Sequence, residues 1–179
     1  MSKKRPEPFE LLQTLDELCR EHSFDLPKLE EQVASWSGVV FKLHGERYIA
    51  PLDEVAEILD IPTMSSVPGA KSWVRGIANV RGTLLPIMDL QGFLYNRPNR
   101  SRTQRLLVIQ QGDFLSSIIV DEVIGLQHFE DFERSQDLPE IDAEVGPYID
   151  DGFSRGEQVW PVFKLSILAE DLDFLQVAI

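Results

Sequence analysis

The chain has 179 residues, of which 43% are hydrophobic and 26% charged, a composition typical of a folded soluble protein with one domain or two small ones. Its formal net charge of −13 argues against nucleic acid as a partner, because binding a phosphate backbone needs a surface rich in Lys and Arg. No apolar run approaches the roughly 20 residues that cross a bilayer, so no direct membrane insertion is expected. The single Cys19 and the lack of a signal-peptide core predict a cytoplasmic protein.

Residues 1–36 are predicted to form an N-terminal helical extension. Residues 7–22 place apolar side chains at helical spacing, a pattern typical of an amphipathic helix of about four turns. A second short helix is expected beyond Pro27, with an apolar face formed by Leu29, Val33 and Trp36. Such faces usually pack on their own domain. Docking into the groove of a partner uses the same pattern and is the alternative.

From residue 37 onward, short apolar runs alternate with glycine-bearing turns, a pattern typical of β-hairpins. The predicted strands are 39–43, 48–52, 77–80, 83–88, 106–110, 114–120, 123–126, 148–154 and 159–165. Pro86 places the fourth strand at a sheet edge or bulge, because proline cannot donate a hydrogen bond. Many short strands with helices only at the margins favour small barrels over a βαβ sheet. Residues 166–177 are expected to end the chain as one helix, with Leu168, Leu172 and Leu175 on one side.

Two charged segments are predicted to be loops. Residues 130–151 carry nine acids and one base, and without EF-hand spacing they favour a long solvated loop over a calcium site. The second segment lies between Asn96 and Leu106 and carries a cluster of basic residues: Arg97, Arg100, Arg102 and Arg105. We expect a solvated loop here. Docking against an acidic partner is the alternative.

Two short patterns occur twice in the same order. Arg81-Gly82 and Arg155-Gly156 each precede an apolar run that contains a proline, and Asp89 in the first copy is replaced by Lys164 in the second. Earlier in each half, a glycine and an acid lead through an apolar run to an Asp-Glu-Val triplet, at 53–55 and at 121–123. The repetition favours a strand-rich unit used twice.

No catalytic constellation is visible, so the chain is expected to bind rather than to catalyse. The histidines His22, His44 and His128 are isolated, and no metal site, nucleotide-binding loop or cofactor motif is present. The carboxylates at the ends of apolar runs are Asp53, Asp89 and Asp121. Such residues usually accept backbone N–H bonds in turns. A hydrolase that uses Asp89 and Asp121 is the alternative.

The same residues resemble the CheW-like family of chemosensory adaptors over about residues 37–172. The shared motifs are Glu54-Val55-Ala56-Glu57-Ile58, the block from Gly76 to Leu90, and the segment from Ile119 to Val123. The N-terminal extension and Trp73 further resemble the form found in type IV pilus twitching systems. The resemblance implies a mainly β domain over 37–179, with two small, intimately packed SH3-like five-stranded barrels and a C-terminal helix.

The resemblance also implies partners and the surfaces that bind them. Such adaptors are non-catalytic, need no cofactor, and are recruited to membrane-associated receptor arrays. They couple the cytoplasmic tip of a methyl-accepting chemoreceptor to the regulatory domain of a CheA-type histidine kinase. The positions that fall where the family contacts its partners are Arg81, Gly82, Val55 and Glu57, with Met88, Val120 and Val123 near the barrel junction that forms the receptor groove. An adaptor of flagellar chemotaxis is the alternative to the pilus system.

Overall fold

The computed structural model describes residues 9, 12–13, 35–112, 114–156 and 158–179. The predicted N-terminal helices therefore lie outside the described residues, apart from a few positions. Trp36 is one of these, and it belongs to a strand rather than to the second predicted helix. It stacks on Phe153 with ring centroids 4.6 Å apart. None of the helices in the described part of the chain is long and apolar enough to cross a membrane.

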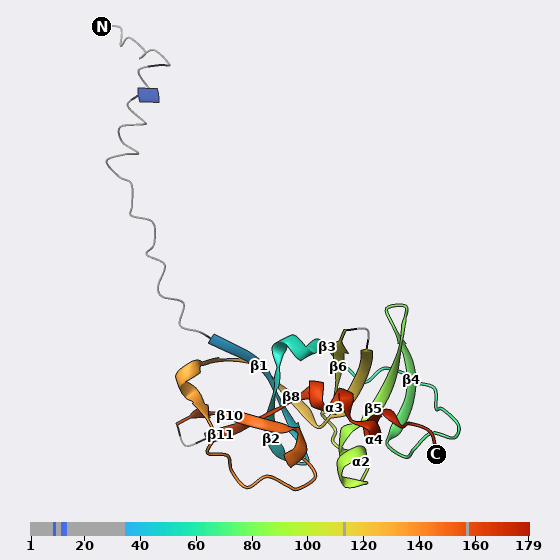
Figure 1. The fold of residues 1–179 in the computed structure, drawn as a ribbon. Helices are drawn as coiled ribbons and strands as arrows, with labels where there is room; N and C mark the ends of the chain where they lie inside the picture. Colours follow the sequence, from blue (N-terminus) through green and yellow to red (C-terminus); the bar gives the residue numbers. More distant parts are fainter. Residues whose placement is uncertain (1–8, 10–11, 14–34, 113, 157) are drawn as a thin grey trace. The chain divides into compact units, whose positions relative to one another are not determined.

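The first sheet has six strands in the order β8-β1-β2-β11-β10-β9 (Figure 1). Their bounds are β1 Ser35–Leu43, β2 Glu46–Pro51, β8 Glu122–Glu130, β9 Arg134–Ser135, β10 Ile149–Arg155 and β11 Gln158–Phe163. The edge strands β8 and β9 are joined only by the short 3-10 helix η2, Asp131–Glu133, so the sheet must curl until its two edges approach. Its interior is filled by Val40, Ile49, Phe129, Phe153 and Val162.

The second sheet has five strands in the order β3-β6-β7-β5-β4. Their bounds are β3 Val55–Leu59, β4 Val74–Val80, β5 Thr83–Asp89, β6 Arg105–Gln111 and β7 Phe114–Val120. The chain after β3 returns to the opposite edge, where Ser65 and Ile77 exchange two backbone hydrogen bonds of 2.9 Å. This bridge closes the second barrel. The predicted mainly β fold of two small barrels is confirmed. The first barrel has one strand more than the predicted five, the two-residue β9.

The two barrels have the same strand topology, and each barrel draws strands from both halves of the chain. With β9 set aside, exchanging β1, β2, β3, β4 and β5 with β6, β7, β8, β10 and β11, respectively, converts the strand order of one sheet into that of the other. Both barrels contain one parallel pair, β2 with β11 and β5 with β7. The repeated sequence patterns fall at equivalent turns. Asp89 N donates to Trp73 O, and the equivalent Lys164 N donates to Tyr148 O, both over 2.8 Å.

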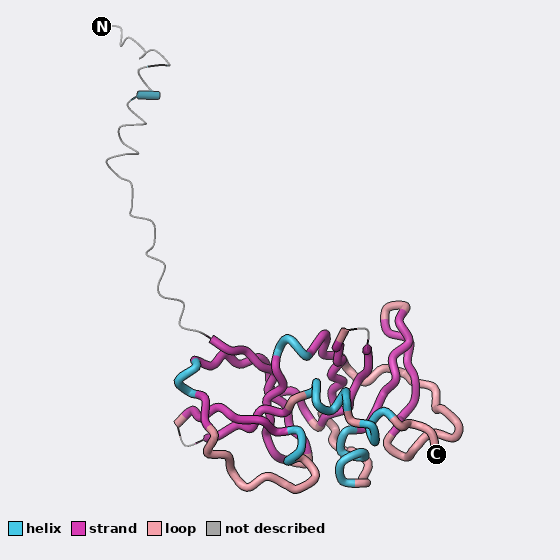
Figure 2. The backbone as a smooth tube through the Cα atoms, in the orientation of Figure 1, coloured by secondary structure: helices cyan, strands magenta, loops and turns pink. Residues whose placement is uncertain are grey.

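A hydrophobic cluster shared by both barrels, here called the junction core, joins them into one body. The first barrel contributes Val39, Phe41, Leu43 and Tyr48, and the second contributes Met88, Leu107, Ile109, Ile118 and Val120. Short helices complete it with Leu90, Leu165, Leu168 and Phe174. Figure 2 shows these helical segments near the middle of the body. Since the shared residues are almost fully buried, moving one barrel against the other would expose apolar surface.

The C-terminal helix differs from its prediction. The helices are α2 Leu90–Tyr95, α3 Leu165–Glu170 and α4 Leu172–Leu175, with 3-10 turns η1 Leu52–Glu54 and η3 Gly146–Tyr148. Asp171 ends α3 and caps α4, because its carboxylate accepts hydrogen bonds from the N–H groups of Asp173 and Phe174. The break turns Phe174 into the junction core and leaves Leu172 81% exposed while Leu168 is fully buried. The prediction of one helix over 166–177 with Leu168, Leu172 and Leu175 on one side is therefore wrong.

Two further predictions, for Pro86 and for the acidic segment 130–151, are corrected by the structure. Pro86 lies in β5, an interior strand, so the predicted edge position is wrong. The predicted alternative, a bulge, occurs one residue further on, where the register with β4 shifts between Val74 and Gly76 opposite Met88 and Ile87. The Pro86 carbonyl accepts a 2.7 Å hydrogen bond from Ser117 Oγ, one residue before the parallel ladder with β7 begins. The acidic segment 130–151 is not one solvated loop, because β8, η2, β9, η3 and β10 occupy much of it. Within it, Val145 is fully buried.

Candidate protein-interaction surface

The turn between β4 and β5 presents Arg81 at the tip of a rigid hairpin. Arg81 and Gly82 have backbone φ angles of 51° and 89°, and two consecutive positive values are the signature of a tight type I′ turn. The N–H of Gly82 donates a 2.9 Å hydrogen bond to Asn79 Oδ1, which fixes the turn from within. The predicted hairpin and its Arg-Gly turn are confirmed, and the turn holds the guanidinium at the surface.

Arg81 has a single weak partner within the described residues. Its Nη2 lies 2.7 Å from Glu57 Oε1 on β3, with side-chain exposures of 76% and 30%. Such an exposed pair is worth about 0.2–1 kcal/mol, because water screens the attraction. Two of the residues that the family resemblance assigns to partner contacts, Arg81 and Glu57, therefore lie side by side. Their pair leaves most of the five guanidinium donors available to another molecule.

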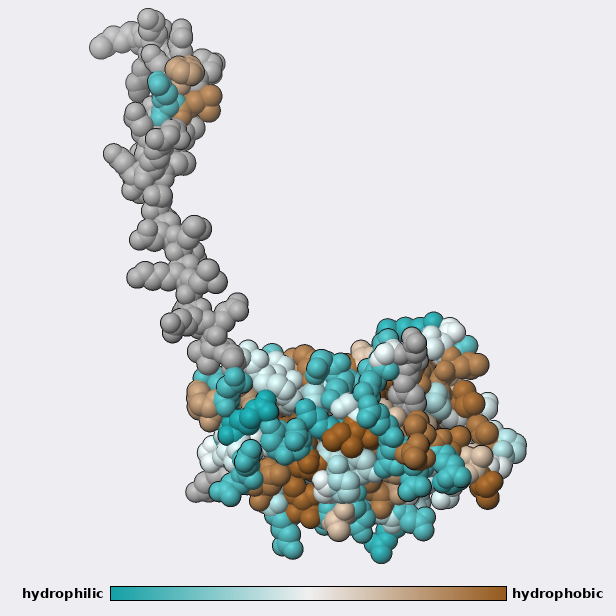
Figure 3. Space-filling view, viewed as in Figure 1, coloured by the Kyte–Doolittle hydropathy of each residue, from teal (hydrophilic) through white to brown (hydrophobic). Residues whose placement is uncertain are grey.

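Apolar side chains surround this charged tip. A hollow of about 230 Å³ opens beside Arg81 and Glu57, lined also by Val80, Leu85 and Leu115. The outer face of the barrel carries exposed apolar residues, Ile58, Ile77 and Leu84, of which Leu84 is 70% exposed. Figure 3 shows hydrophobic residues gathered on the side of the molecule where β4 and β5 lie. Arginine is enriched among the residues that carry most of the energy of protein interfaces, and exposed apolar residues that gather on one surface mark a site of interaction.

The second Arg-Gly turn, between β10 and β11, is used differently. Arg155 pairs with both carboxylate oxygens of Glu133 over 2.7 and 2.9 Å, and its Nη2 donates to His128 O over 2.6 Å. Its guanidinium carbon also lies 4.7 Å from the centroid of the Phe129 ring. These hydrogen bonds, with one from the Glu130 N–H, lower the pKa of Glu133 to about 2. Of the two turn arginines, Arg155 thus pairs within its own barrel, and Arg81 keeps unused donors.

The remaining predicted residues lie below or beside this surface. Met88 is 3% exposed and Val120 fully buried, so both belong to the junction core. Val55 and Val123 are half-buried at equivalent strand starts, where they pack against the same core. The structure thus brings Arg81, Gly82 and Glu57 together at the hairpin tip. The valines and Met88 line the region where the barrels meet.

Comparison with known proteins places the chain in a family. The model of the CheW-like domain matches residues 37–172, which is more than half of the chain. The chain belongs to the CheW-like domain family. It is 46% identical over 173 residues to Protein PilI of Pseudomonas aeruginosa, covering 96% of this chain and 97% of that protein. It is also 32% identical over 89 residues to Protein FrzA of Myxococcus xanthus, covering 49% and 55% of the two chains.

A solved structure confirms the CheW-like fold independently. The crystal structure of scaffolding protein TtCheW from Thermoanaerobacter tengcongensis superimposes with a TM-score of 0.65 at 20% sequence identity. The match covers 78% of this chain and 96% of that protein. The predicted membership in the CheW-like family is confirmed by the domain match over residues 37–172 and by the identity with PilI.

The two carboxylates considered for catalysis hold this CheW-like domain together. Asp89 is 1% exposed, and its oxygens accept hydrogen bonds from Gly92 N over 3.0 Å and Asn99 N over 2.8 Å. Asp121 accepts from Gly45 N over 3.1 Å and from Asn99 Nδ2 over 2.7 Å. The expectation that these residues accept N–H bonds in turns is confirmed. No group of three or more potential metal ligands occurs among the described residues.

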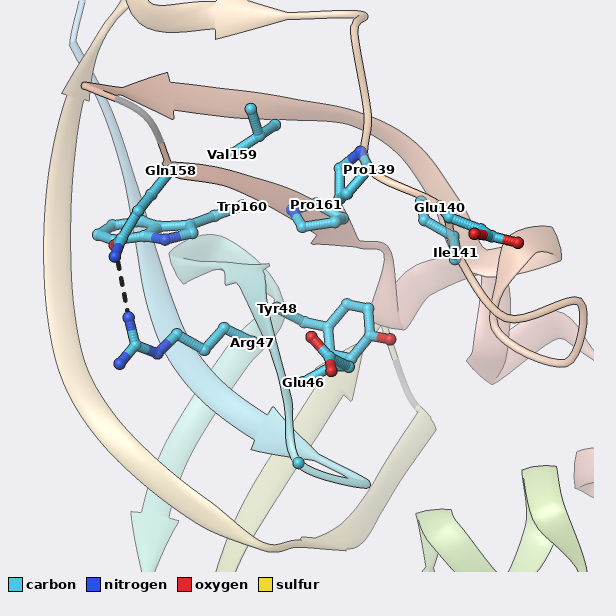
Figure 4. A pocket seen from close by; sticks show the side chains of 11 residues that line it. Glu46, Arg47, Tyr48, Pro139, Glu140, Ile141, Gln158, Val159, Trp160 and Pro161 are labelled. Atoms are coloured by element: carbon cyan, nitrogen blue, oxygen red, sulfur yellow. Dashed lines mark hydrogen bonds between the residues drawn. The ribbon is translucent and has the colours of Figure 1, made fainter.

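A second hollow, of about 290 Å³, lies in the six-stranded barrel of the CheW-like domain (Figure 4). The parallel strands β2 and β11 pair only at Ile49 and Val162, so they diverge toward their N-terminal ends. Trp160 and Tyr48 line the resulting gap, and Arg47 Nη1 spans it with a 3.4 Å hydrogen bond to Gln158 Oε1. Burial is the main cause that raises the pKa of Tyr48 to about 12, so its hydroxyl stays protonated. The hollow follows from where the parallel ladder ends.

Proposed function

We propose that this chain is a non-catalytic adaptor that couples a methyl-accepting chemoreceptor to a CheA-type histidine kinase. The system would control twitching motility by type IV pili, as in the form that the N-terminal extension resembles. Identity of 46% with PilI across nearly the whole of both chains supports this assignment over a flagellar system. Identity with the chemotaxis protein CheW of Bacillus subtilis is lower, 28% over 111 residues.

The observation that carries the proposal is the exposed, weakly paired Arg81 on a rigid hairpin. Arg81, Gly82 and Glu57 form the first partner surface, which the half-buried Val55, two residues before Glu57 on β3, extends toward the junction core. The tight turn fixes the backbone that carries Arg81, so little backbone freedom is lost on binding and more of the contact energy appears as affinity. Leu84 adds an apolar contact area at the same tip.

The receptor would bind near the meeting point of the barrels. Val123 reaches the surface there, and Met88 and Val120 support it from within the junction core. The junction core holds both partner surfaces in one rigid body, so a receptor and a kinase bound to it keep a defined relative position. A ligand-induced change in the receptor then shifts the active–inactive equilibrium of the kinase through differential binding. Recruitment to membrane-associated receptor arrays follows from the receptor contact.

Titration calorimetry with the isolated regulatory domain of the CheA-type kinase and with a receptor cytoplasmic tip tests the proposal. We expect Arg81→Glu to weaken binding to one of these partners about tenfold or more, since a hot-spot arginine contributes at least that. The control is Arg47→Glu, an exposed arginine on β2, which changes the net charge equally. Unchanged binding of both partners to Arg81→Glu would remove the hairpin tip from the interface.

The pilus and flagellar systems are separated by a genetic test. Deleting the gene should abolish twitching and leave swimming intact, and the wild-type gene should restore twitching. Loss of swimming with normal twitching would assign the adaptor to a flagellar chemotaxis system.

A further inference from the structure

The loop that joins the two halves of the chain carries positive charge that the fold leaves unpaired. Residues 96–104 lie between α2 and β6, and three arginines in it are exposed: Arg97, Arg100 and Arg102. Within the described residues none of the three forms a salt bridge, although Arg105 beside them pairs with Asp60 over 3.3 Å. The whole chain has 30 acidic residues against 17 Lys and Arg. Clustered cations that remain unpaired on such an acidic protein are available to an external anion.

The loop is held in place by a buried asparagine. Asn99 is 5% exposed and stands between two carboxylates, with its N–H donating to Asp89 and its side-chain Nδ2 donating to Asp121. Its Oδ1 accepts from Ser101 N and Gln104 Nε2, both over 2.9 Å. These bonds tie the loop to the ends of β5 and β7. The arginines therefore project from a fixed backbone, which lowers the ordering cost of binding.

The arginines border a surface hollow. A depression of about 560 Å³ is lined by Arg97, Arg100, His44 and Gln91, among others. Asp121 also lines it and sets one negative charge against the two positive charges of Arg97 and Arg100. The ring of His44, which lines the hollow, stacks on Tyr95 with ring centroids 4.5 Å apart. The local charge is positive, and guanidinium groups match the planar geometry of carboxylates.

We propose that the loop 96–104 is a docking surface for an acidic polypeptide segment of a partner protein. An acidic polypeptide fits better than a membrane or a nucleic acid, because a chain of net charge −13 is repelled by an extended anionic surface. A narrow peptide can contact the arginines alone. The proposal does not depend on the kinase and receptor assignment. The hairpin tip lies at the Thr83 end of β5, and the loop is attached at the Asp89 end. The length of this strand, roughly 20 Å, separates the two surfaces.

The test uses a fluorescein-labelled peptide of ten glutamates, whose binding to the full-length chain is followed by anisotropy. We expect the wild type to bind at low ionic strength and to release the peptide when salt shortens the screening length. Arg100→Glu should weaken binding about threefold, and the triple variant R97E/R100E/R102E about tenfold or more. The charge-matched control Arg47→Glu should bind as the wild type does.

A second variant separates a preorganised surface from a diffuse charge effect. Asn99→Ala keeps every arginine and the net charge but removes the anchors of the loop, so binding should weaken several-fold. The triple variant R97E/R100E/R102E changes only exposed side chains, so it should keep the circular dichroism spectrum and melting temperature of the wild type. If Asn99→Ala unfolds, the triple variant therefore still tests the loop arginines in a folded protein.

Three outcomes overturn the proposal. The wild type fails to bind the peptide, or Arg100→Glu and Arg47→Glu weaken binding equally, or the loop arginines are needed only for binding to phosphatidylglycerol vesicles. The last result would assign the loop to a membrane surface instead.

Discussion

Replacing Phe174 by alanine tests how the C-terminal helices close the molecule. The Phe174 ring is fully buried in the junction core, stacked 5.5 Å from the Trp73 ring and set edge-on 5.2 Å from the Phe93 ring. Truncating a buried phenylalanine costs about 3–5 kcal/mol, because the transfer free energy is lost and a cavity remains. For a chain of this length each kcal/mol lowers the melting temperature by about 2–4 °C. Phe174→Ala should therefore lower it by roughly 6–20 °C.

The matched control is Leu172→Ala, two positions away on the same short helix. Leu172 is 81% exposed, so its truncation should change the unfolding free energy by less than about 0.5 kcal/mol. Urea unfolding monitored by tryptophan fluorescence measures both variants, since Trp73 contacts Phe174 directly. Equal destabilisation by the two substitutions would refute the break at Asp171 and favour the single helix that the leucine spacing predicts.

Three further predictions concern backbone and charge. Gly82→Ala should cost roughly 1–2 kcal/mol, because its φ is positive but no atom lies within 4 Å of the added Cβ. Gly76→Ala should cost more in the same urea titration, because its Cβ would lie 2.3 Å from Ser65 O, in the bridge that closes the second barrel. Glu133 has a folded pKa of about 2 against its ordinary 4.5, so its bond to Arg155 stabilises the fold above pH 4.5 and is lost as the pH falls toward 2. Between pH 4.5 and 2, the free energy of unfolding from urea titrations should fall less steeply for Glu133→Gln than for the wild type.

Local sequence patterns predict the hairpins of this fold well. The turns at His44-Gly45, Arg81-Gly82 and Gly112 require positive φ angles, which Gly and a few other residues tolerate, and the flanking runs are rich in strand-forming residues. The exposed position of Leu84 also follows from the register. A two-residue turn at Arg81-Gly82 places Leu84 opposite Asn79 on the outer face. The continuous apolar run from Leu84 to Met88 does not by itself show which of its residues face outward.

Long-range pairing is what the sequence does not encode locally. Two parallel ladders join strands from different halves of the chain. One of them pairs β5 with β7, so Pro86 lies in an interior strand instead of an edge strand. Burial is equally non-local. Met88 and Val120 carry the apolar character of interface residues, yet both are enclosed by residues from the other barrel. The role of Asn99 depends on two carboxylates that only the fold brings together. No spacing rule links such positions.

Reconstituted kinase autophosphorylation tests the central claim most directly, namely that this chain transmits receptor state to a kinase without chemistry of its own. The kinase and the receptor cytoplasmic tip would be assayed with the wild-type chain, with Arg81→Glu, and with neither. We predict that the receptor changes the autophosphorylation rate only when the wild-type chain is present. An equal receptor effect in the absence of the chain, or with Arg81→Glu, would contradict the adaptor mechanism built on the hairpin tip.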